Sequence, residues 1–216
     1  MQEFVFLTGM VIKQSPSGES NRRVVLLTKE RGKVVAFARG ARKQGSRLAA
    51  CTNTFAFGTF KCYPGKEAYS LEDAEIKNYF EELMSDYEGA YYGMYFAEIA
   101  DYYARENNDE KELLKLLYQS LRALTVPALS KPLVRAIFEC KAIAVNGEYP
   151  GAPQGRGLSD SAMYALNYIG ESSIEKLYTF TVTEEVLLEI LKIAEEYCAK
   201  YMKHSFKSLE IIKTLC

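Results

Sequence analysis

The segment from Lys33 to Arg47 gathers positive charge around one aromatic ring. It reads KVVAFARGARKQGSR and begins as a strand-like run, in which alternate side chains lie on opposite faces. Lys33, Phe37 and Arg39 then share one face, and the loop that follows carries three more cations. Cationic groups that follow phosphates, next to a ring that stacks on a base, are what binding to single strands of any sequence requires. The segment therefore predicts a nucleic-acid-binding surface.

Arg22 and Arg23 can extend this surface, because they lie on the run that would pair with it. They point to opposite faces, so at least one of them can join. The alternative is that these charges only keep a small barrel soluble. Glu30 is the only acid between residues 20 and 50, which favours the binding interpretation. The candidate phosphate contacts are Arg22, Arg23, Lys33, Arg39, Arg42, Lys43 and Arg47, and Phe37 is the candidate for base stacking.

Charge is distributed unevenly along the 216 residues. Residues 1–70 carry 12 Lys and Arg against 4 Asp and Glu, whereas residues 71–216 carry 15 against 24. The formal net charge of −1 therefore conceals a cationic amino-terminal module. Such a module indicates nucleic acid or another anionic surface as its partner, because neutralised phosphates release their counterions.

Residue types that commonly catalyse reactions form no recognisable constellation in this sequence. His204 is the only histidine, and it has no cysteine or carboxylate partner in a known metal or nucleophile arrangement. Neither a Walker loop nor a G-x-G-x-x-G motif occurs. The adjacent acids Glu72–Asp73 and Glu195–Glu196 are interpreted as solvated faces or strand ends. We predict a protein without catalytic activity; a metal-dependent nuclease is an alternative that no motif favours.

The cysteines and the amino terminus indicate a reducing compartment. The cysteines lie far apart, form no C-x-x-C pair and are odd in number, which predicts reduced, inert thiols. The start of the chain lacks the pattern of a signal peptide, and no run of about eighteen apolar residues occurs. We expect a cytoplasmic protein without a membrane segment. The cysteines are Cys51, Cys62, Cys140, Cys198 and Cys216.

The amino-terminal third reads as a compact β-barrel. Five strand-like runs are separated by turn residues, and they cover residues 4–14, 22–29, 33–40, 54–63 and 67–76. The second and third runs predict a hairpin, in which Gly32 supplies the left-handed conformation of a short turn. Residues 15–21 and 40–50 predict loops, and RLAA in the second loop predicts a short helix.

Helical periodicity replaces the strand pattern after about Lys77. Tyrosine-rich residues 78–107 predict one helix of roughly 40 Å at about 1.5 Å per residue. Further helices are expected at 109–125, 130–146, 159–169 and 183–203, the last capped by Thr183. Residues 147–157 contain too much Gly and Pro to be helix or strand. The chain is therefore predicted to be α+β, with a barrel domain at 1–78 and an all-α domain at 79–216.

The order GESNRRVVLLTKERGKVVAFARGARKQGSRLAA, the helical remainder and the closing HSFKSLEIIKTL resemble the RecO family of bacterial recombination mediators. The resemblance is most specific at Gly18–Ser20, Gly32–Lys33, Gly40–Arg42 and Ser46–Leu48. It implies a five-stranded OB-fold barrel, a helical carboxy-terminal domain and no enzymatic turnover. Members bind single- and double-stranded DNA and anneal complementary strands. They engage the acidic tail of the single-strand-binding protein, and with RecR they help to load RecA. A nucleoid-associated cytoplasmic location follows.

One departure from that family concerns zinc. Many members carry a four-cysteine zinc module after a glycine-proline stretch, but the corresponding region at 147–158 has no cysteine here. No cofactor is therefore expected, and packing must replace the metal unless the segment is mobile.

Two further points stay open in the sequence. Fold alone does not separate a DNA-binding barrel from one that recognises RNA or a protein, so an RNA-binding or protein-interaction module is the alternative function. The docking place of an acidic tail is also undetermined, and the candidate cations for it are Lys131, Arg135, Lys141 and Lys203.

Overall fold

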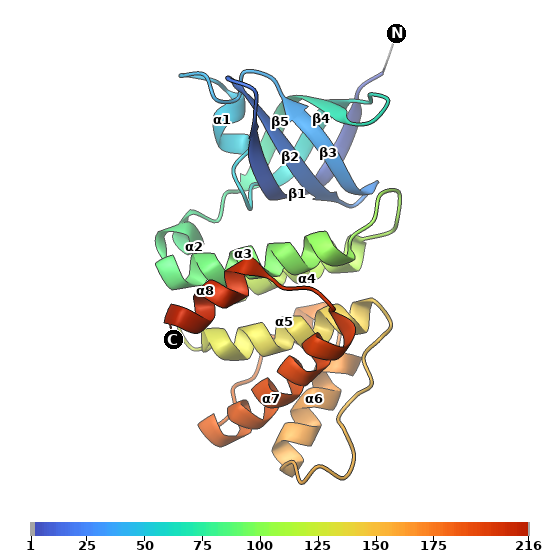
Figure 1. The fold of residues 1–216 in the computed structure, drawn as a ribbon, viewed down its shortest axis with the longest axis vertical. Coiled ribbons are helices and arrows are strands. Elements are labelled where there is room, and N and C mark those ends of the chain that lie inside the picture. Colours follow the sequence, from blue (N-terminus) through green and yellow to red (C-terminus); the bar gives the residue numbers. More distant parts are fainter. Residues whose placement is uncertain (1–2, 216) are drawn as a thin grey trace. The chain divides into compact units, whose positions relative to one another are not determined.

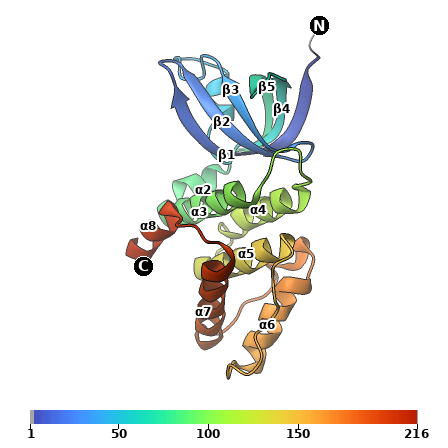
Figure 2. The ribbon, with the colours of Figure 1, turned by 45° about the vertical axis from the view of Figure 1, so that its right-hand side comes forward.

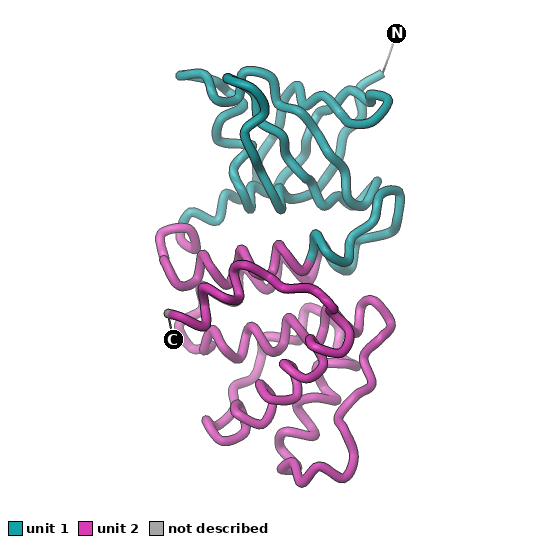
Figure 3. Tube along the Cα trace, viewed as in Figure 1, with its two compact units in different colours: residues 1–81, 100–114 teal, residues 82–99, 115–216 magenta. Residues whose placement is uncertain are grey.

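The structure is a computed structural model that describes residues 3–215. The chain divides into two compact units, which are described separately here (Figure 3). The barrel unit comprises Met1–Glu81 and Ala100–Leu114, and the helical unit comprises Glu82–Ile99 and Lys115–Cys216. The last barrel strand ends at Asn78, where the sequence places the domain boundary. The compact barrel unit also includes Ala100–Leu114, a segment within the range predicted as the all-α domain.

Five strands close into a barrel in the order β1-β2-β3-β5-β4 (Figure 1). All neighbouring strands are antiparallel except β3 and β5, which are parallel. The predicted five-stranded OB-type barrel is confirmed, and the short helix predicted in RLAA is α1. The elements are β1 (Val5–Ser17), β2 (Asn21–Thr28), β3 (Gly32–Ala38), α1 (Leu48–Cys51), β4 (Phe57–Tyr63) and β5 (Tyr69–Asn78).

Alternation of buried and more exposed residues along β3 and β4 gives the barrel an apolar inner face. On β3, Val34, Ala36 and Ala38 are buried, while Val35 and Phe37 between them lie on the opposite face and are more exposed. β4 alternates in the same way, and residues of all five strands fill one apolar interior, around which the strands curve in Figure 2. Besides the three β3 residues, this core includes Leu7, Val11, Val24, Leu26, Phe60, Cys62 and Leu71.

The hairpin between β2 and β3 depends on Gly32. Its φ of 62° lies in the left-handed region, as the sequence predicts. A Cβ at this position would lie 2.3 Å from the main-chain oxygen of Arg105. Within the barrel unit, Lys33 N also donates to Arg105 O at 3.0 Å, and Asn107 N donates to Arg31 O at 2.8 Å. The segment 100–114 is therefore hydrogen-bonded to this hairpin.

The rest of the described chain is helical, and none of its helices is both long and apolar enough to cross a membrane. Four predicted helices are confirmed as α4 to α7, and Thr183 caps α7 by accepting from Val186 N. The helices are α2 (Glu81–Ser85), α3 (Tyr87–Tyr103), α4 (Lys111–Ala123), α5 (Lys131–Val145), α6 (Asp160–Glu171), η1 (Ile174–Lys176), α7 (Glu184–Tyr201) and α8 (Lys207–Leu215).

The single long tyrosine-rich helix predicted for residues 78–107 is wrong. The segment contains two helices, α2 and α3, which meet at Ser85 and Asp86. The Asp86 carboxylate accepts the main-chain N–H of Gly89 and so caps the start of α3. A Cβ on Gly89 would lie 2.7 Å from that carboxylate. The Asp86 side chain thus satisfies donors at the start of a new helix, at a point where the aromatic spacing predicted one continuous helix.

The Gly- and Pro-rich segment 147–158 is irregular, as predicted, and hydrogen bonds hold it in the helical unit. Tyr149 donates through its hydroxyl to Leu166 O at 2.9 Å. The Tyr197 hydroxyl donates to Gly151 O at 2.8 Å, and Ala152 N donates to the Asn167 side chain at 2.9 Å. Groups of α6 and α7 therefore position this cysteine-free segment.

Candidate nucleic-acid interface

A row of outward side chains crosses four strands of the barrel. Arg23 on β2 pairs with Phe37 on β3, which pairs with Ser70 on β5. Ser70 also pairs with Tyr63 on β4. We call Arg23, Phe37, Ser70 and Tyr63 the outer row. It faces away from the interior because the adjacent strand residues are core residues, namely Val24, Ala36, Ala38, Cys62 and Leu71.

Phe4 continues the aromatic part of this row. Its ring centroid lies 3.9 Å from that of Tyr63, and the Lys61 ammonium lies 3.7 Å from the Phe4 centroid. Such a cation over an aromatic face is attractive. Phe4 and Tyr63 were not among the predicted site residues, because they lie outside the cation-rich residues 20–50. The alternation of residues 54–63 carried the signal for Tyr63, since it sets Lys61 and Tyr63 opposite the buried Cys62.

A hollow of about 520 Å³ opens beside the outer row. Arg39 and Arg47 reach it from the two ends of one loop, and Tyr63 reaches it from β4. Its other lining residues are Ser46, Leu48, Ser70, Leu71 and Glu72. The hollow therefore combines two guanidinium groups with one aromatic ring. This is the arrangement needed to hold a phosphate and an unpaired base at the same time.

The loop that carries the cations is anchored to the barrel by its apolar residues. Ala41 and Leu48 are buried in the barrel core. Gly40, with a φ of 68°, turns the chain out of β3, and its N–H donates to the Asn21 side chain at 2.9 Å. Arg42 N donates to Ser20 O at 2.9 Å. The backbone between β3 and α1 is thus fixed while its long side chains point into solvent.

Four of the predicted phosphate contacts have a charge that is available to a ligand. They are Arg23, Arg39, Arg42 and Lys43. Arg23, Arg39 and Lys43 have no ion-pair partner within residues 3–215. The Arg42 side chain is exposed, and its guanidinium donates to Gly18 O at 3.2 Å. Phe37, the predicted stacking ring, is 37% exposed. These five residues fit the predicted interface.

Arg47 lies in the hollow but is already paired. Its guanidinium lies 3.4 Å from a carboxylate oxygen of Glu72 and 3.4 Å from one of Asp73. It also donates to Glu72 O at 3.0 Å. All three side chains are largely exposed, so these ion pairs are weak and a phosphate can compete for the guanidinium.

Two of the predicted phosphate contacts serve the fold instead. The Nη1 of Arg22 donates to Ala49 O at 3.0 Å and to the Thr52 hydroxyl at 2.8 Å, and so ties β2 to α1. The Lys33 ammonium donates to the main-chain and carboxylate oxygens of Asp101, at 2.7 and 3.1 Å. Internal acceptors occupy both groups, so we leave Arg22 and Lys33 out of the candidate interface. Sequence position alone did not reveal these partners.

The adjacent acid pairs also have structural partners. Glu72 and Asp73 hold Arg47, while Glu195 and Glu196 pair with Arg135 and Arg156. No group of three or more His, Cys, Asp or Glu side chains that could hold a metal ion occurs in residues 3–215.

Among the described residues, the thiols of Cys51, Cys62 and Cys140 are buried and that of Cys198 is partly buried. Burial raises the pKa of the Cys51 thiol to about 11 and that of Cys62 to about 12. Cys51, Cys62, Cys140 and Cys198 are free, as predicted, and Cys216 lies outside the described residues. At neutral pH a thiol with such a pKa is protonated and therefore a poor nucleophile.

Three of the four cations suggested for binding an acidic tail are engaged within the helical unit. Lys131 pairs with Asp86 and Glu88, at 3.1 and 3.2 Å. Lys141 is buried and donates to Gly170 O and Ser172 O. Arg135 is also buried, beside Glu139 and Glu195, and only Lys203 is exposed. The first three are therefore poor candidates for docking a tail.

Comparison with known proteins agrees with this architecture. The profile described as "Recombination protein O N terminal" matches residues 1–80, and that described as "Recombination protein O C terminal" matches residues 84–152 and 148–210. The "DNA repair protein RecO" of Acetivibrio thermocellus is 27% identical over 96% of both chains. The protein of that name from Clostridium novyi is 28% identical over 95% of this chain and 92% of its own. The Bacillus pumilus protein of that name is 33% identical over 68% of this chain and 57% of its own. Since the two profiles together span the barrel and the helices, this chain belongs to the RecO family.

Proposed function

We propose that this chain is a non-catalytic DNA-binding recombination mediator that acts in DNA repair. The observation that carries the proposal is the outer row with its adjoining hollow, where exposed arginines and aromatic rings share one face of the barrel. Relatives that match nearly the whole chain are named DNA repair proteins, which supports the choice of DNA over other polyanions.

The geometry suggests how a single strand binds. Bases of a single strand are free to stack, and Phe37 and Tyr63 offer ring faces for them. Arg23, Arg39 and Lys43 neutralise the phosphates between those bases. Duplex DNA hides its base faces, so the same surface holds it only through phosphate contacts and binds it more weakly. Neutralised phosphates also repel a second strand less, which favours annealing of complementary strands.

The partners in this proposal rest on family membership. Other RecO proteins work with RecR, engage the carboxy-terminal tail of single-strand-binding protein and help to load RecA. We extend that role to this chain, acting at the chromosome in the cytoplasm. Lys203, the exposed member of the four candidate cations, is the first to test for the tail.

Salt dependence of binding tests the barrel surface. If about five cations contact a single strand, the logarithm of the binding constant falls with the logarithm of salt concentration at a slope near −3.5. Arg39→Gln with Lys43→Gln should reduce that slope by about 1.4. The matched control is Arg122→Gln with Lys207→Gln, which removes two exposed cations from helices and should leave the slope unchanged. Equal slopes in the two double variants would remove the barrel surface from the mechanism.

A second variant tests stacking separately from charge. Tyr63→Ala should weaken single-strand binding by about 1–3 kcal/mol and duplex binding much less. Phe6→Ala is the control, because Phe6 is 62% exposed on the same barrel but lies beside the carboxylates of Asp73 and Glu75. Fluorescence anisotropy with matched DNA and RNA strands measures both effects. A clear preference for RNA would favour the alternative of an RNA-binding module.

Annealing with and without bound single-strand-binding protein tests the mediator role. We expect this chain to accelerate pairing of complementary strands, and to do so on strands coated with that protein. DNA binding without annealing would restrict the proposal to the binding step.

A further inference from the structure

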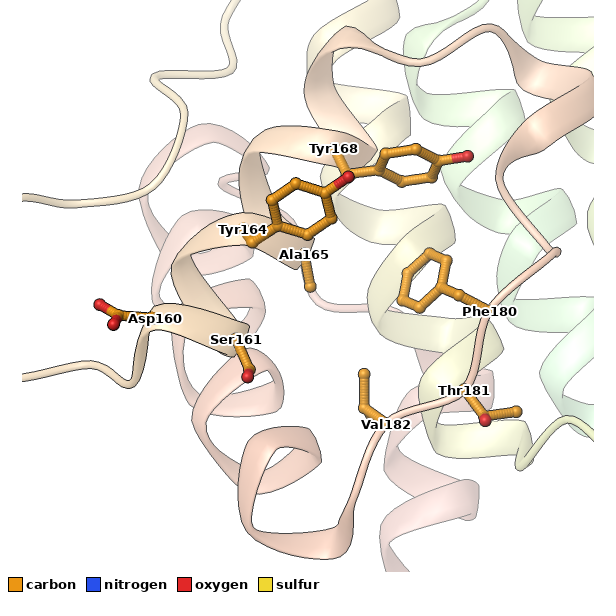
Figure 4. A pocket seen from close by; sticks show the side chains of 8 residues that line it. All are labelled: Asp160, Ser161, Tyr164, Ala165, Tyr168, Phe180, Thr181 and Val182. Carbon is orange, nitrogen blue, oxygen red and sulfur yellow. The ribbon is translucent and has the colours of Figure 1, made fainter.

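The helical unit contains an aromatic hollow that the DNA-binding role does not use. Tyr164 and Tyr168 from α6 face Phe180 and Val182 from the segment before α7 across about 560 Å³ (Figure 4). We call these four residues the aromatic hollow. Ala165, Ser161, Thr181 and Asp160 complete its lining. A space of this size fits a large side chain with its neighbours.

The rings of the hollow are arranged before any ligand binds. Tyr164 and Tyr168 are one helical turn apart, with centroids at 6.2 Å and ring planes 24° apart. Phe180 meets Tyr168 edge to face at 5.5 Å. The Tyr168 hydroxyl donates to Lys176 O at 3.1 Å, which fixes that ring. Tyr164 is 72% exposed, so a large apolar surface lies open to water.

The extended segment Phe180–Val182 adds main-chain hydrogen-bonding groups. Within residues 3–215, the main-chain N–H and C=O groups of these three residues form no hydrogen bond. An extended peptide can pair with such groups while it inserts a side chain between the rings. A small apolar molecule would leave them unused. The hollow therefore suits a peptide segment better than a small molecule.

The charges around the hollow favour a cationic segment. Asp160 lies at its rim, and Glu184 and Glu185 are exposed in the first turn of α7, directly after the segment that forms one wall. Lys176 lies near the opposite end, where its carbonyl holds Tyr168. Neither Lys nor Arg is among the lining residues. Three carboxylates against one ammonium select positive charge in the ligand.

We propose that the aromatic hollow docks a short extended segment of a protein partner, in which a large apolar side chain is flanked by Lys or Arg. The apolar side chain enters between Tyr164, Tyr168 and Phe180. The flanking cations approach Asp160 and the start of α7. This site differs in charge preference from the barrel surface, which attracts a polyanion.

Tryptophan fluorescence offers a direct assay, because the chain contains no tryptophan. The probe is a blocked five-residue peptide with Trp between two lysines. Two matched peptides replace the lysines by glutamates or the Trp by Ala, and the Ala peptide serves as an unlabelled competitor. We expect saturable binding of the lysine peptide, at least about fivefold weaker binding of the glutamate peptide and no competition by the Ala peptide.

Variants locate the binding and test its charge dependence. Tyr164→Ala should weaken the lysine peptide about tenfold or more. The control Tyr87→Ala removes an equally exposed tyrosine, 67% accessible, from α3 and should have no effect. Combining Asp160→Asn, Glu184→Gln and Glu185→Gln should abolish the preference for lysine over glutamate. Single-stranded DNA affinity should stay unchanged in all these variants, which separates this site from the barrel.

Several results would overturn the proposal. One is the absence of saturable binding by any peptide, and another is equal binding of the lysine and glutamate peptides. A third is unchanged binding in Tyr164→Ala. Concentration-dependent self-association that Tyr164→Ala abolishes would identify a second copy of this chain as the occupant instead.

Discussion

Arginine has two different roles in the two units. In the helical unit, Arg135 is buried between α5 and α7, 3.3 Å from Glu139 and 2.8 Å from Glu195. In the barrel unit, Arg39 is exposed and faces the hollow next to Tyr63. The difference shows that the nearest carboxylate and the degree of burial decide what an arginine does. A count of positive charges does not distinguish the two roles.

The barrel itself contains an arginine with internal partners, an arginine that is available to a ligand, and one that is exposed but ion-paired. Arg22 and Arg23 are adjacent in sequence, yet the first ties β2 to α1 and the second belongs to the outer row. Arg47 lies in the hollow but pairs with two exposed carboxylates. Substitutions at Arg22 and Arg23, and at the two carboxylates that pair with Arg47, test the comparison.

The largest expected effect is loss of stability in Arg135→Leu. This change leaves the carboxylate of Glu139, which is 1% exposed, without its cation, and the free energy of unfolding should fall by about 3–5 kcal/mol. Urea unfolding measures it, with Arg39→Leu as control, for which a change of about 0.5 kcal/mol or less is expected. Arg135→Leu with Glu139→Leu should recover most of the loss. A single variant as stable as the control would contradict a structural role for Arg135.

Acidification should reduce that loss. Burial raises the pKa of the Glu139 carboxyl, and Arg135 opposes the shift. In the Leu variant Arg135 no longer opposes the upward shift, while Tyr95 still donates to the carboxylate, so the folded pKa lies further above the unfolded value. The penalty is then present above the pKa of an ordinary glutamate and disappears as the pH falls below it. A loss that does not depend on pH would point to packing instead of charge.

The second prediction separates the two neighbours Arg22 and Arg23. Arg22→Gln removes the donor to Ala49 O and Thr52, so the free energy of unfolding should fall by about 1–3 kcal/mol. Arg23→Gln should leave stability nearly unchanged but reduce the salt slope of single-strand binding by about 0.7. Unfolding and anisotropy titrations on the same two proteins check both. An exchange of the two effects would show that the outer row is assigned to the wrong residue.

The smallest expected effect is a gain of affinity when Arg47 is released. Glu72→Gln with Asp73→Asn removes both competing carboxylates, and single-strand affinity should rise about two- to fivefold at low salt. The control Glu67→Gln with Glu75→Gln removes the same charge from exposed positions of the barrel unit. A larger gain in the first variant measures competition for Arg47. Equal gains would mean that only net charge matters.

The sequence predicted the barrel well because its information is local. Every second residue of a strand lies on the same face, so the spacing of Val34, Ala36 and Ala38 predicts a shared apolar face without reference to the rest of the chain. Gly32 likewise identified its hairpin. The split of the tyrosine-rich segment was missed because the Asp86 carboxylate caps α3 by accepting the main-chain N–H groups of Glu88 and Gly89, which aromatic spacing does not reveal.

The candidate site was predicted only in part, because its partners come from distant parts of the chain. Asp101 engages Lys33 from 68 residues away, and Thr52 engages Arg22 from 30 residues away. Tyr63 enters the hollow through strand pairing with Ser70. Charge density in one window therefore identified a region rich in cations, while contacts between segments decide which of those cations are available.

The contribution of residues 100–114 to the barrel unit has a consequence for inheritance. Gene fusion and recombination move continuous stretches of coding sequence, but this unit is encoded in two separated stretches. A transplant of the first stretch alone would deprive Lys33 of Asp101 and the Gly32 hairpin of its contact with Arg105. Natural shuffling should therefore have preserved the two halves of this chain together, and a shortened paralogue that keeps only the strands should show compensating changes at positions 32 and 33.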